Sequence, residues 1–234
     1  MEYFSSANTT VGGNFKKTEQ SKMDRTYKYL GYFLLLLIPL IFAGFYKTYF
    51  QPFPNFGKNI DTYIHIHAVI ATLWVSILII QPFLIINKKV SLHRKVGKLS
   101  YIVFPLLIIS FIPRVIKTYN AGDFPFLFFP LGDGSLLVLF YALAIYYKKK
   151  TAKHMRYMIA SALVLMGPTF GRIGPNLLGW PELLTQNVEY GIIYFILISL
   201  ILYDLKNKRQ FQPYLVAILG FIIHQFVYYW VFLW

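Results

Sequence analysis

The sequence predicts an all-α fold, a polytopic transmembrane bundle of seven helices with a cytoplasmic N-terminus and an extracytoplasmic C-terminus. Of the 234 residues, 57% are hydrophobic and only 14% are charged, whereas soluble domains carry about one quarter charged residues. The apolar residues form long uncharged blocks, and a helix needs about 20 such residues to cross about 30 Å of hydrocarbon. Lys and Arg also alternate between rich and poor connections, as expected when successive helices cross a membrane in opposite directions.

Seven apolar blocks account for the expected spans. The blocks are continuous rather than alternating, which favours helices over a barrel, because each helix satisfies its own backbone groups in lipid. The fourth block opens with Pro130, Gly132 and Asp133, and its helix is expected to begin near Asp133, a favourable N-cap residue. The blocks are 29–49, 62–87, 98–117, 127–147, 155–172, 188–204 and 213–234.

The chain divides into a short polar segment and one membrane domain. Residues 1–25 are rich in Ser, Thr, Asn and Gly and are expected to form a flexible cytoplasmic tail. Residues 26–234 are expected to form the seven-helix transmembrane domain. The first block lies too far into the chain and is too long for a signal-peptide core, so it is interpreted as a retained span. The chain has no cysteine, which excludes disulfides and thiolate metal sites.

The net charge of +14 is distributed as orientation signals rather than as a nucleic-acid surface. The basic residues lie in short clusters between apolar blocks, and no basic domain is large enough to hold a duplex. Most of them fall beside the N-terminus and at every second connection, which the positive-inside rule assigns to the cytoplasm. The expected partner is therefore the lipid bilayer, with a small molecule or other membrane proteins as further partners and no nucleic acid.

The second block carries a polar and aromatic stripe. His67, Trp74 and Gln81 are seven residues apart, which places them on one helix face. Polar residues inside a span are costly and mark candidate sites. The stripe covers about 21 Å of depth at 1.5 Å per residue, so it is too long for one compact site. His65 lies about 200° around the helix from His67, and which of the two faces the interior is left open.

The fifth block has a similar stripe that runs from His154 to Arg172. Gly167 and Pro168 are expected to kink this helix, because proline lacks the backbone donor. Arg172 needs an anion or carbonyl partners, and Asp133 and Asp61, both expected on the extracytoplasmic side, are the candidates. We therefore expect a polar ligand-binding pocket. Its candidate residues are His67, Trp74, Gln81, Asp133 and Arg172.

Histidines on several helices raise the possibility of a metal or haem. His93 and His154 begin the third and fifth helices at the same expected level, and each is next to an arginine, Arg94 or Arg156, for an anionic group such as a haem propionate or a lipid headgroup. His67 and His224 differ in expected depth by about 6 Å. These four are the candidate metal or haem ligands, with haem b as the candidate cofactor. Interfacial histidines that only bond to the backbone would give the same pattern.

Several motifs together resemble a family of uncharacterised bacterial multi-spanning membrane proteins. They are FAGFYKTYF (42–50), HIHAVIATLWVSILIIQPFLI (65–85), LHRKVGKLS (92–100), PLGDGSLLVLFYALAIYYKKK (130–150) and KHMRYMIASALVLMGPTFGRI (153–173). The likeness covers about residues 30–175 and implies a multi-pass protein of the bacterial plasma (inner) membrane, without an activity. A fainter likeness, through the HR-x-x-G turn, links the chain to predicted membrane proteins involved in oxidase assembly.

Three classes of function are compared. The favoured hypothesis is a small-ligand-binding or redox-accessory bundle with a haem-type or quinone-type ligand. The alternative is a proton-linked transporter or permease with a polar pocket that opens to the outer side. Catalysis is the least favoured, because no Ser-His-Asp set, carboxylate pair or H-E-x-x-H zinc pattern is visible in the sequence.

Overall fold

A computed structural model of the chain describes residues 27–56 and 60–233. This part of the chain is helical and contains no strand, which confirms the predicted all-α class. The predicted tail, residues 1–25, lies outside the described residues.

The described helices form seven columns, several of them interrupted by a short break. The first column consists of α2 (Leu30–Leu35), α3 (Leu37–Phe45) and η1 (Tyr46–Phe50), and the second is α4 (Thr62–Ile86). The third combines α5 (Val90–Ile109) and α6 (Ile112–Asn120), and the fourth η3 (Phe124–Leu127), η4 (Phe129–Asp133) and α7 (Gly134–Tyr146). The fifth combines α8 (Thr151–Val164), α9 (Met166–Ile173) and η5 (Gly174–Leu178). The last two are α10 (Glu182–Lys206) and α11 (Gln212–Leu233).

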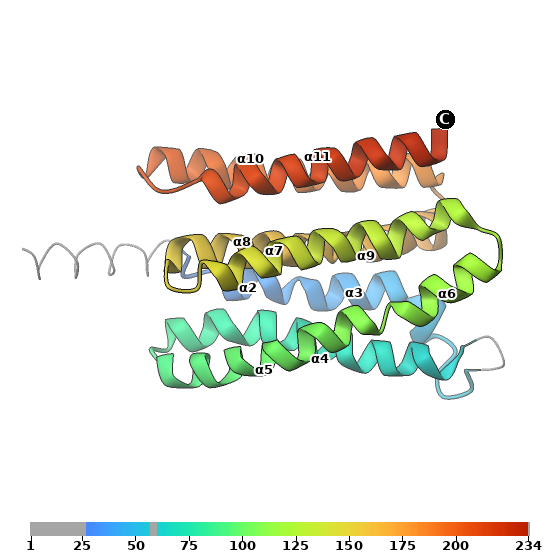
Figure 1. Cartoon of the computed structure of the whole chain (residues 1–234), viewed down its shortest axis with the longest axis horizontal. Coiled ribbons are helices and arrows are strands. Elements are labelled where there is room, and N and C mark those ends of the chain that lie inside the picture. Colours follow the sequence, from blue (N-terminus) through green and yellow to red (C-terminus); the bar gives the residue numbers. More distant parts are fainter. Residues whose placement is uncertain (1–26, 57–59, 234) are drawn as a thin grey trace, which may run out of the picture.

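The columns are stacked in layers, with the first column inside the bundle (Figure 1). α10 and α11 form the outermost layer at the top, and α4 and α5 form the layer at the bottom. Between them, α2 and α3 contact α4 on one side and α9 on the other. α6 leaves the bottom layer and rises toward the start of α7.

Six of the seven columns are long and apolar enough to cross a membrane, so the protein is a multi-pass membrane protein. The exception is the fifth column. It is surrounded by α3, α7, α10 and α11, and residues Ile159–Val164 of α8 are all buried. A helix enclosed by other helices does not need an apolar surface toward lipid. This explains why hydropathy marks the fifth column less clearly as a membrane span than the other six.

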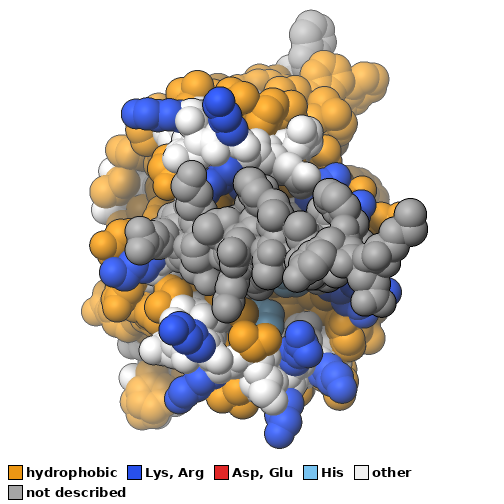
Figure 2. Space-filling view, turned by 90° about the vertical axis from the view of Figure 1, so that its left-hand side faces the viewer, with side chains coloured by type: hydrophobic (Ala, Val, Ile, Leu, Met, Phe, Trp, Pro, Cys, Tyr) orange, Lys and Arg blue, Asp and Glu red, His pale blue; other side chains and the backbone are white. Residues whose placement is uncertain are grey.

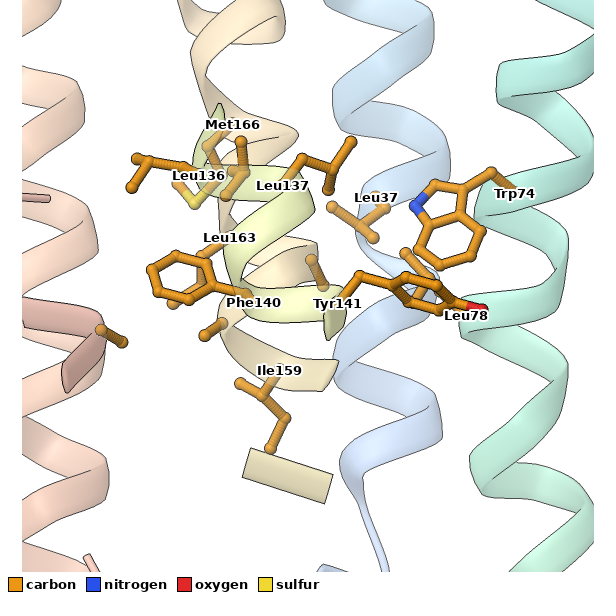
Figure 3. Close-up of a cluster of buried hydrophobic side chains, with 14 of the residues drawn as sticks. Leu37, Trp74, Leu78, Leu136, Leu137, Phe140, Tyr141, Ile159, Leu163 and Met166 are labelled. Carbon is orange, nitrogen blue, oxygen red and sulfur yellow. The ribbon is translucent and has the colours of Figure 1, made fainter. Parts of the chain in front are cut away.

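The middle of the bundle is filled by large side chains (Figure 3). Trp74 on α4 is fully buried, with ring centroids 5.0 Å from Phe104 and 5.3 Å from Tyr141. Phe104 and Tyr141 stack at 3.9 Å. This cluster ties α4, α5 and α7 together, so the predicted stripe residue Trp74 serves packing at the bundle centre.

Two expected local features occur in a modified form. The fifth column breaks at Leu165, three residues before Pro168, where the missing proline N–H removes a helical hydrogen bond. The expectation that the fourth helix begins near Asp133 is wrong, because η4 continues through Asp133 into α7 and Asp133 has helical backbone angles and makes no capping hydrogen bond. The Asp133 carboxylate instead lies against α9 and α11, as described below.

Charge is distributed unequally between the two ends of the bundle. The α4–α5, α7–α8 and α10–α11 connections lie at one end, where Lys and Arg side chains gather (Figure 2). Among the described residues, Asp204 is the single acid of this end, and the other acids lie toward the opposite end. The asymmetry agrees with the charge pattern of the sequence, and the orientation drawn from that pattern remains a prediction.

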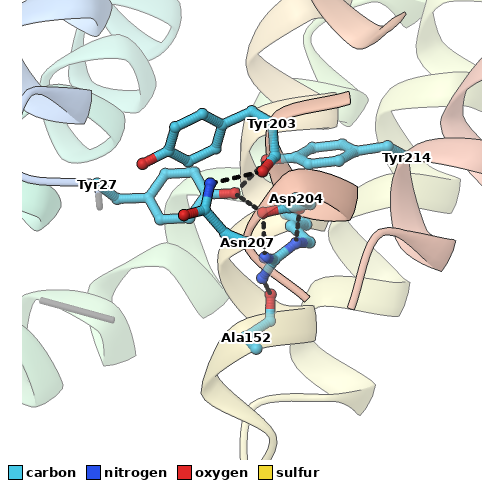
Figure 4. A network of polar contacts seen from close by, with 7 residues as sticks. Tyr27, Ala152, Tyr203, Asp204, Asn207 and Tyr214 are labelled. Carbon is cyan, nitrogen blue, oxygen red and sulfur yellow. Dashed lines mark hydrogen bonds and ion pairs between the residues drawn. The ribbon is translucent and has the colours of Figure 1, made fainter. Parts of the chain in front are cut away.

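A buried ion pair anchors the basic end (Figure 4). Arg156 donates from Nε to Asp204 Oδ2 at 2.7 Å and from Nη2 to Asp204 Oδ1 at 2.8 Å. Arg156 Nη1 donates to the Ala152 carbonyl at 2.8 Å. The Tyr27 hydroxyl donates to Asp204 Oδ1 at 3.1 Å and lies 3.3 Å from the Tyr214 hydroxyl. The network joins α8, α10, α11 and the residue that leads into α2.

Candidate functional site

A groove opens on the side of the bundle between the start of the fourth column and α11. Its volume is about 430 Å³, and most of its wall is apolar. Two of the lining side chains are polar, Ser135 and His224. The lining residues are Phe124, Pro125, Leu127, Phe128, Leu131, Gly132, Ser135, Leu136, Leu139, Gly220, Ile223, His224, Val227 and Val231.

The groove faces the region that lipid would occupy. Leu131 and Ile223 on its edges are 51% and 56% exposed, which is expected of side chains that contact acyl chains in a membrane. Gly132 and Gly220 let η4 and α11 pack closely beside the groove, since a Cβ at Gly132 would lie 2.8 Å from His224 Nε2 and one at Gly220 would lie 3.1 Å from Phe140. The groove is therefore accessible sideways, from the bilayer.

His224 forms the floor of the groove and is held from both sides of its ring. Its Nδ1 lies 2.8 Å from the Tyr190 hydroxyl on α10, and its Nε2 lies 3.4 Å from Asp133 Oδ1. The Nε2 atom is buried and makes no hydrogen bond within the described residues, so the contact with Asp133 is one of distance only. The Phe128 ring packs on the imidazole at 4.5 Å between centroids.

A second carboxyl group lies behind this chain. Glu189 on α10 is 4% exposed, and its Oε2 has no hydrogen-bond partner among the described residues. Asp133 is close enough for its charge to act on Glu189. The structure therefore gathers Asp133, Glu189, Tyr190 and His224 from three helical columns into one polar group, which we call the inner polar group.

Glycines on the fifth column make this gathering possible. Gly167, Gly171 and Gly174 repeat at spacings of four and three, which places them on one face. A Cβ at Gly167 would lie 3.0 Å from Asp133 Oδ1, and one at Gly174 would lie 2.0 Å from Thr185 Oγ1. The absent side chains let η4 and α10 approach this column with polar groups in between, as small residues do at membrane helix contacts.

A chain of hydrogen bonds continues from this region along the contact of α10 with α11. The Tyr194 hydroxyl donates to Gln225 Oε1 at 2.8 Å, and Gln225 Nε2 donates to the Tyr229 hydroxyl at 3.2 Å. Tyr229 in turn donates to Asn187. These bonds fix the register of the two helices on which Tyr190 and His224 stand.

His67, Asp133 and Arg172 lie toward the same end of the bundle, but no hydrogen bond joins any two of them. Arg172 Nη1 donates to the Pro168 carbonyl at 2.5 Å, and its guanidinium lies 4.5 Å from the centre of the Phe45 ring. Its charge acts on both His67 and Asp133. Arg172 thus finds a carbonyl and an aromatic ring as its direct partners.

The stripe on α4 packs along α5. His67 Nδ1 lies 2.7 Å from the Ser110 hydroxyl at the end of α5, and Gln81 Nε2 donates to the His93 carbonyl at 3.2 Å. The buried Trp74 lies between them against Phe104. The stripe is therefore an interhelical seam. His65 is turned toward the first column instead, with Nδ1 3.0 Å from the Tyr49 hydroxyl.

The charge of His154 acts on His93, and a metal or haem held by these histidines stays a prediction. His154 Nδ1 donates to the Ala144 carbonyl at 2.8 Å, while His93 Nδ1 is buried without a hydrogen-bond partner in the described part. The guanidinium of Arg156, a candidate for a haem propionate, is occupied by Asp204. Within residues 27–56 and 60–233, no group of three or more His, Asp and Glu side chains is placed to hold a metal ion.

Sequence reasoning missed three important residues, and a signal existed for each. Glu189, Tyr190 and Asp204 lie on α10, for which no motif was recognised. Glu189 and Asp204 are ionisable residues within an otherwise apolar helix, which by itself marks a candidate site. The predicted block began at residue 188, so Glu189 was placed at the membrane surface, whereas α10 begins at Glu182 and buries it.

Comparison of the chain with protein-family models, with curated proteins and with solved structures found no match. The class of protein therefore follows from its own fold and site. It is a multi-pass helical membrane protein with a lateral apolar groove and a group of ionisable side chains behind the groove floor.

Proposed function

We propose that this protein binds a lipid-soluble small molecule that carries a hydrogen-bonding head group, of the quinone type, in the groove between the fourth column and α11. The observation that carries the proposal is the groove itself, with a volume of about 430 Å³. Ligand pockets typically enclose a few hundred Å³ and combine an apolar wall with few polar groups. A molecule dissolved in the bilayer could enter without crossing a polar surface.

The groove supports a specific orientation of such a molecule. Phe128, Leu136 and Val227 offer apolar surface to a ring or tail. The Ser135 hydroxyl lines the groove and can donate a hydrogen bond to a carbonyl oxygen, or accept one from a hydroxyl. The Nδ1 atom of His224 is bonded to Tyr190 and its Nε2 atom is buried, so the imidazole ring offers a packing surface and Ser135 supplies the hydrogen-bonding group.

Photo-crosslinking in lipid nanodiscs tests the proposal with a benzoquinone whose alkyl tail carries a diazirine. We expect the adducts to concentrate in residues 124–139 and 220–231. Val227→Trp fills the groove and should remove most of these adducts. Val216→Trp is the matched control, because Val216 is a lipid-exposed valine of the same helix outside the groove. Adducts spread evenly over all lipid-facing helices, or unaffected by Val227→Trp, would contradict the proposal.

Proton-linked transport is the second candidate function. It is favoured by the inner polar group, because proton-linked carriers place carboxyl and histidine side chains inside the bundle. The closely packed centre around Trp74 and Tyr141 means that this function would require a second conformation. The test is solute uptake into proteoliposomes under an imposed proton gradient, measured for a set of candidate solutes. If the gradient drives no uptake of any of them, the result counts against proton-linked transport.

We further propose that the protein lies in a bacterial plasma membrane with its basic end toward the cytoplasm. The clusters of Lys and Arg at the α4–α5, α7–α8 and α10–α11 connections support this orientation. Because the chain has no cysteine, single cysteines can report it. A membrane-impermeant maleimide added to intact cells should label Asn120→Cys, and should label Lys89→Cys only after permeabilisation. The reverse pattern would invert the orientation.

A further inference from the structure

The described contacts of the buried Glu189 carboxyl group do not explain a role for it in stabilising the fold. Its side chain is 4% exposed, and Oε2 is enclosed without a hydrogen-bond donor in the described part of the chain. In contrast, Asp204, which is equally enclosed on the same helix, accepts two hydrogen bonds from Arg156. One helix thus carries one fully paired carboxylate and one carboxyl without such a pair.

An unpaired carboxylate at this position would be very unfavourable. Moving a charged carboxyl group from water into a protein interior costs several kcal/mol unless a counter-charge and hydrogen bonds replace the water. Besides burial, the charge of Asp133, which has the same sign, acts on Glu189. Taking up a proton removes both the burial cost and the repulsion between the two acids.

We propose that Glu189 is a proton-binding site inside the membrane domain and carries an exchangeable proton at neutral pH. The proton is held within the inner polar group, next to the floor of the groove. The ligand in this inference is a proton and the residue is Glu189, and neither takes part in the proposed binding in the groove. The inference can therefore hold whether or not the groove binds a quinone-type molecule.

The surroundings of Glu189 define which groups share in this equilibrium. η4 contributes Asp133, α11 contributes Tyr228 and α10 itself contributes Tyr190.

Isotope-edited infrared spectroscopy of the full chain in nanodiscs tests the inference. The sequence contains four glutamates, Glu2, Glu19, Glu182 and Glu189. Replacing the first three by Gln leaves Glu189 as the single glutamate without changing the inner polar group. With ¹³C-carboxyl glutamate incorporated, we expect the carbonyl band of a protonated acid at pH 7, and its conversion to carboxylate only at higher pH.

The matched control is Glu189→Gln with the other three glutamates kept. Glu182 is exposed and opens the same helix, so this control is expected to show labelled carboxylate and no protonated acid at pH 7. The inference is overturned if the labelled Glu189 is entirely ionised at pH 7, or if the protonated band persists unchanged in the Glu189→Gln chain. Neither result bears on the crosslinking pattern in the groove, so the two proposals fail separately.

Discussion

The Arg156–Asp204 pair allows a quantitative test of how the bundle is stabilised. The side chains are 1% and 0% exposed, and two hydrogen bonds join them. Asp204→Ala leaves a buried guanidinium without its counter-charge, which costs about 3–5 kcal/mol in comparable sites. For the cycle, the double change Arg156→Met with Asp204→Leu leaves no buried charge and should cost less than Arg156→Met alone or Asp204→Leu alone.

Equilibrium unfolding in mixed detergent micelles provides the measurement, as a double-mutant cycle. The chain offers a matched control in the pair of Lys117 with Asp61, whose atoms lie 2.6 Å apart but whose side chains are 55% and 43% exposed. Asp61→Asn should therefore cost between 0 and about 1 kcal/mol. The reasoning is refuted if Asp204→Ala costs no more than Asp61→Asn, or if the effects of the two single changes simply add in the double variant.

Two further predictions concern the basic end and the fifth column. Burial raises the pKa of Tyr27 from 10.0 to about 12, so the contribution of its hydroxyl to stability is complete below pH 10 and is lost as the pH rises toward 12. At pH 7, Tyr27→Phe removes the hydrogen bond to Asp204 and should lower the free energy of unfolding by about 1 kcal/mol. Between pH 9 and pH 11, the free energy of unfolding should fall less for the variant than for the wild type. An equal decrease in both would contradict the assignment. Gly174→Ala brings a Cβ to 2.0 Å from Thr185 Oγ1 and should destabilise the bundle by about 1–3 kcal/mol. Gly191 has open space around it, so Gly191→Ala should change stability by no more than about 1 kcal/mol. Similar unfolding midpoints for the two variants would contradict the argument that α10 approaches Gly174 closely.

The architecture was predictable because membrane crossing imposes strong local rules. Block length and the alternation of basic connections indicated seven helices, and the structure contains seven columns of which six are apolar enough to span. The spacing of His67, Trp74 and Gln81 correctly placed them on one face. The spacing could not indicate what that face contacts. The face packs against α5, and the spacing of polar residues is the same whether they contact another helix or line a polar cavity.

The inner polar group could not be assembled from the sequence, because its members come from η4, α10 and α11. Their proximity depends on the glycine face of the fifth column, which sets how closely these helices approach. Asp133 was singled out as a pocket residue with Arg172, and the structure also places His224 Nε2 3.4 Å from its carboxylate. Glu189 was overlooked because the start of its helix was predicted too late in the sequence, and helix ends are the least certain part of a hydropathy assignment.

The most direct test of the account is a cryo-electron microscopy map of the protein purified from its own membrane into nanodiscs. We expect ordered non-protein density between α7 and α11 that contacts Ser135 and the His224 ring, and that is sharper than the lipid around the other helices. A groove closed by its own side chains, or density no more ordered there than elsewhere on the lipid-facing surface, would contradict the proposal that this groove is the binding site.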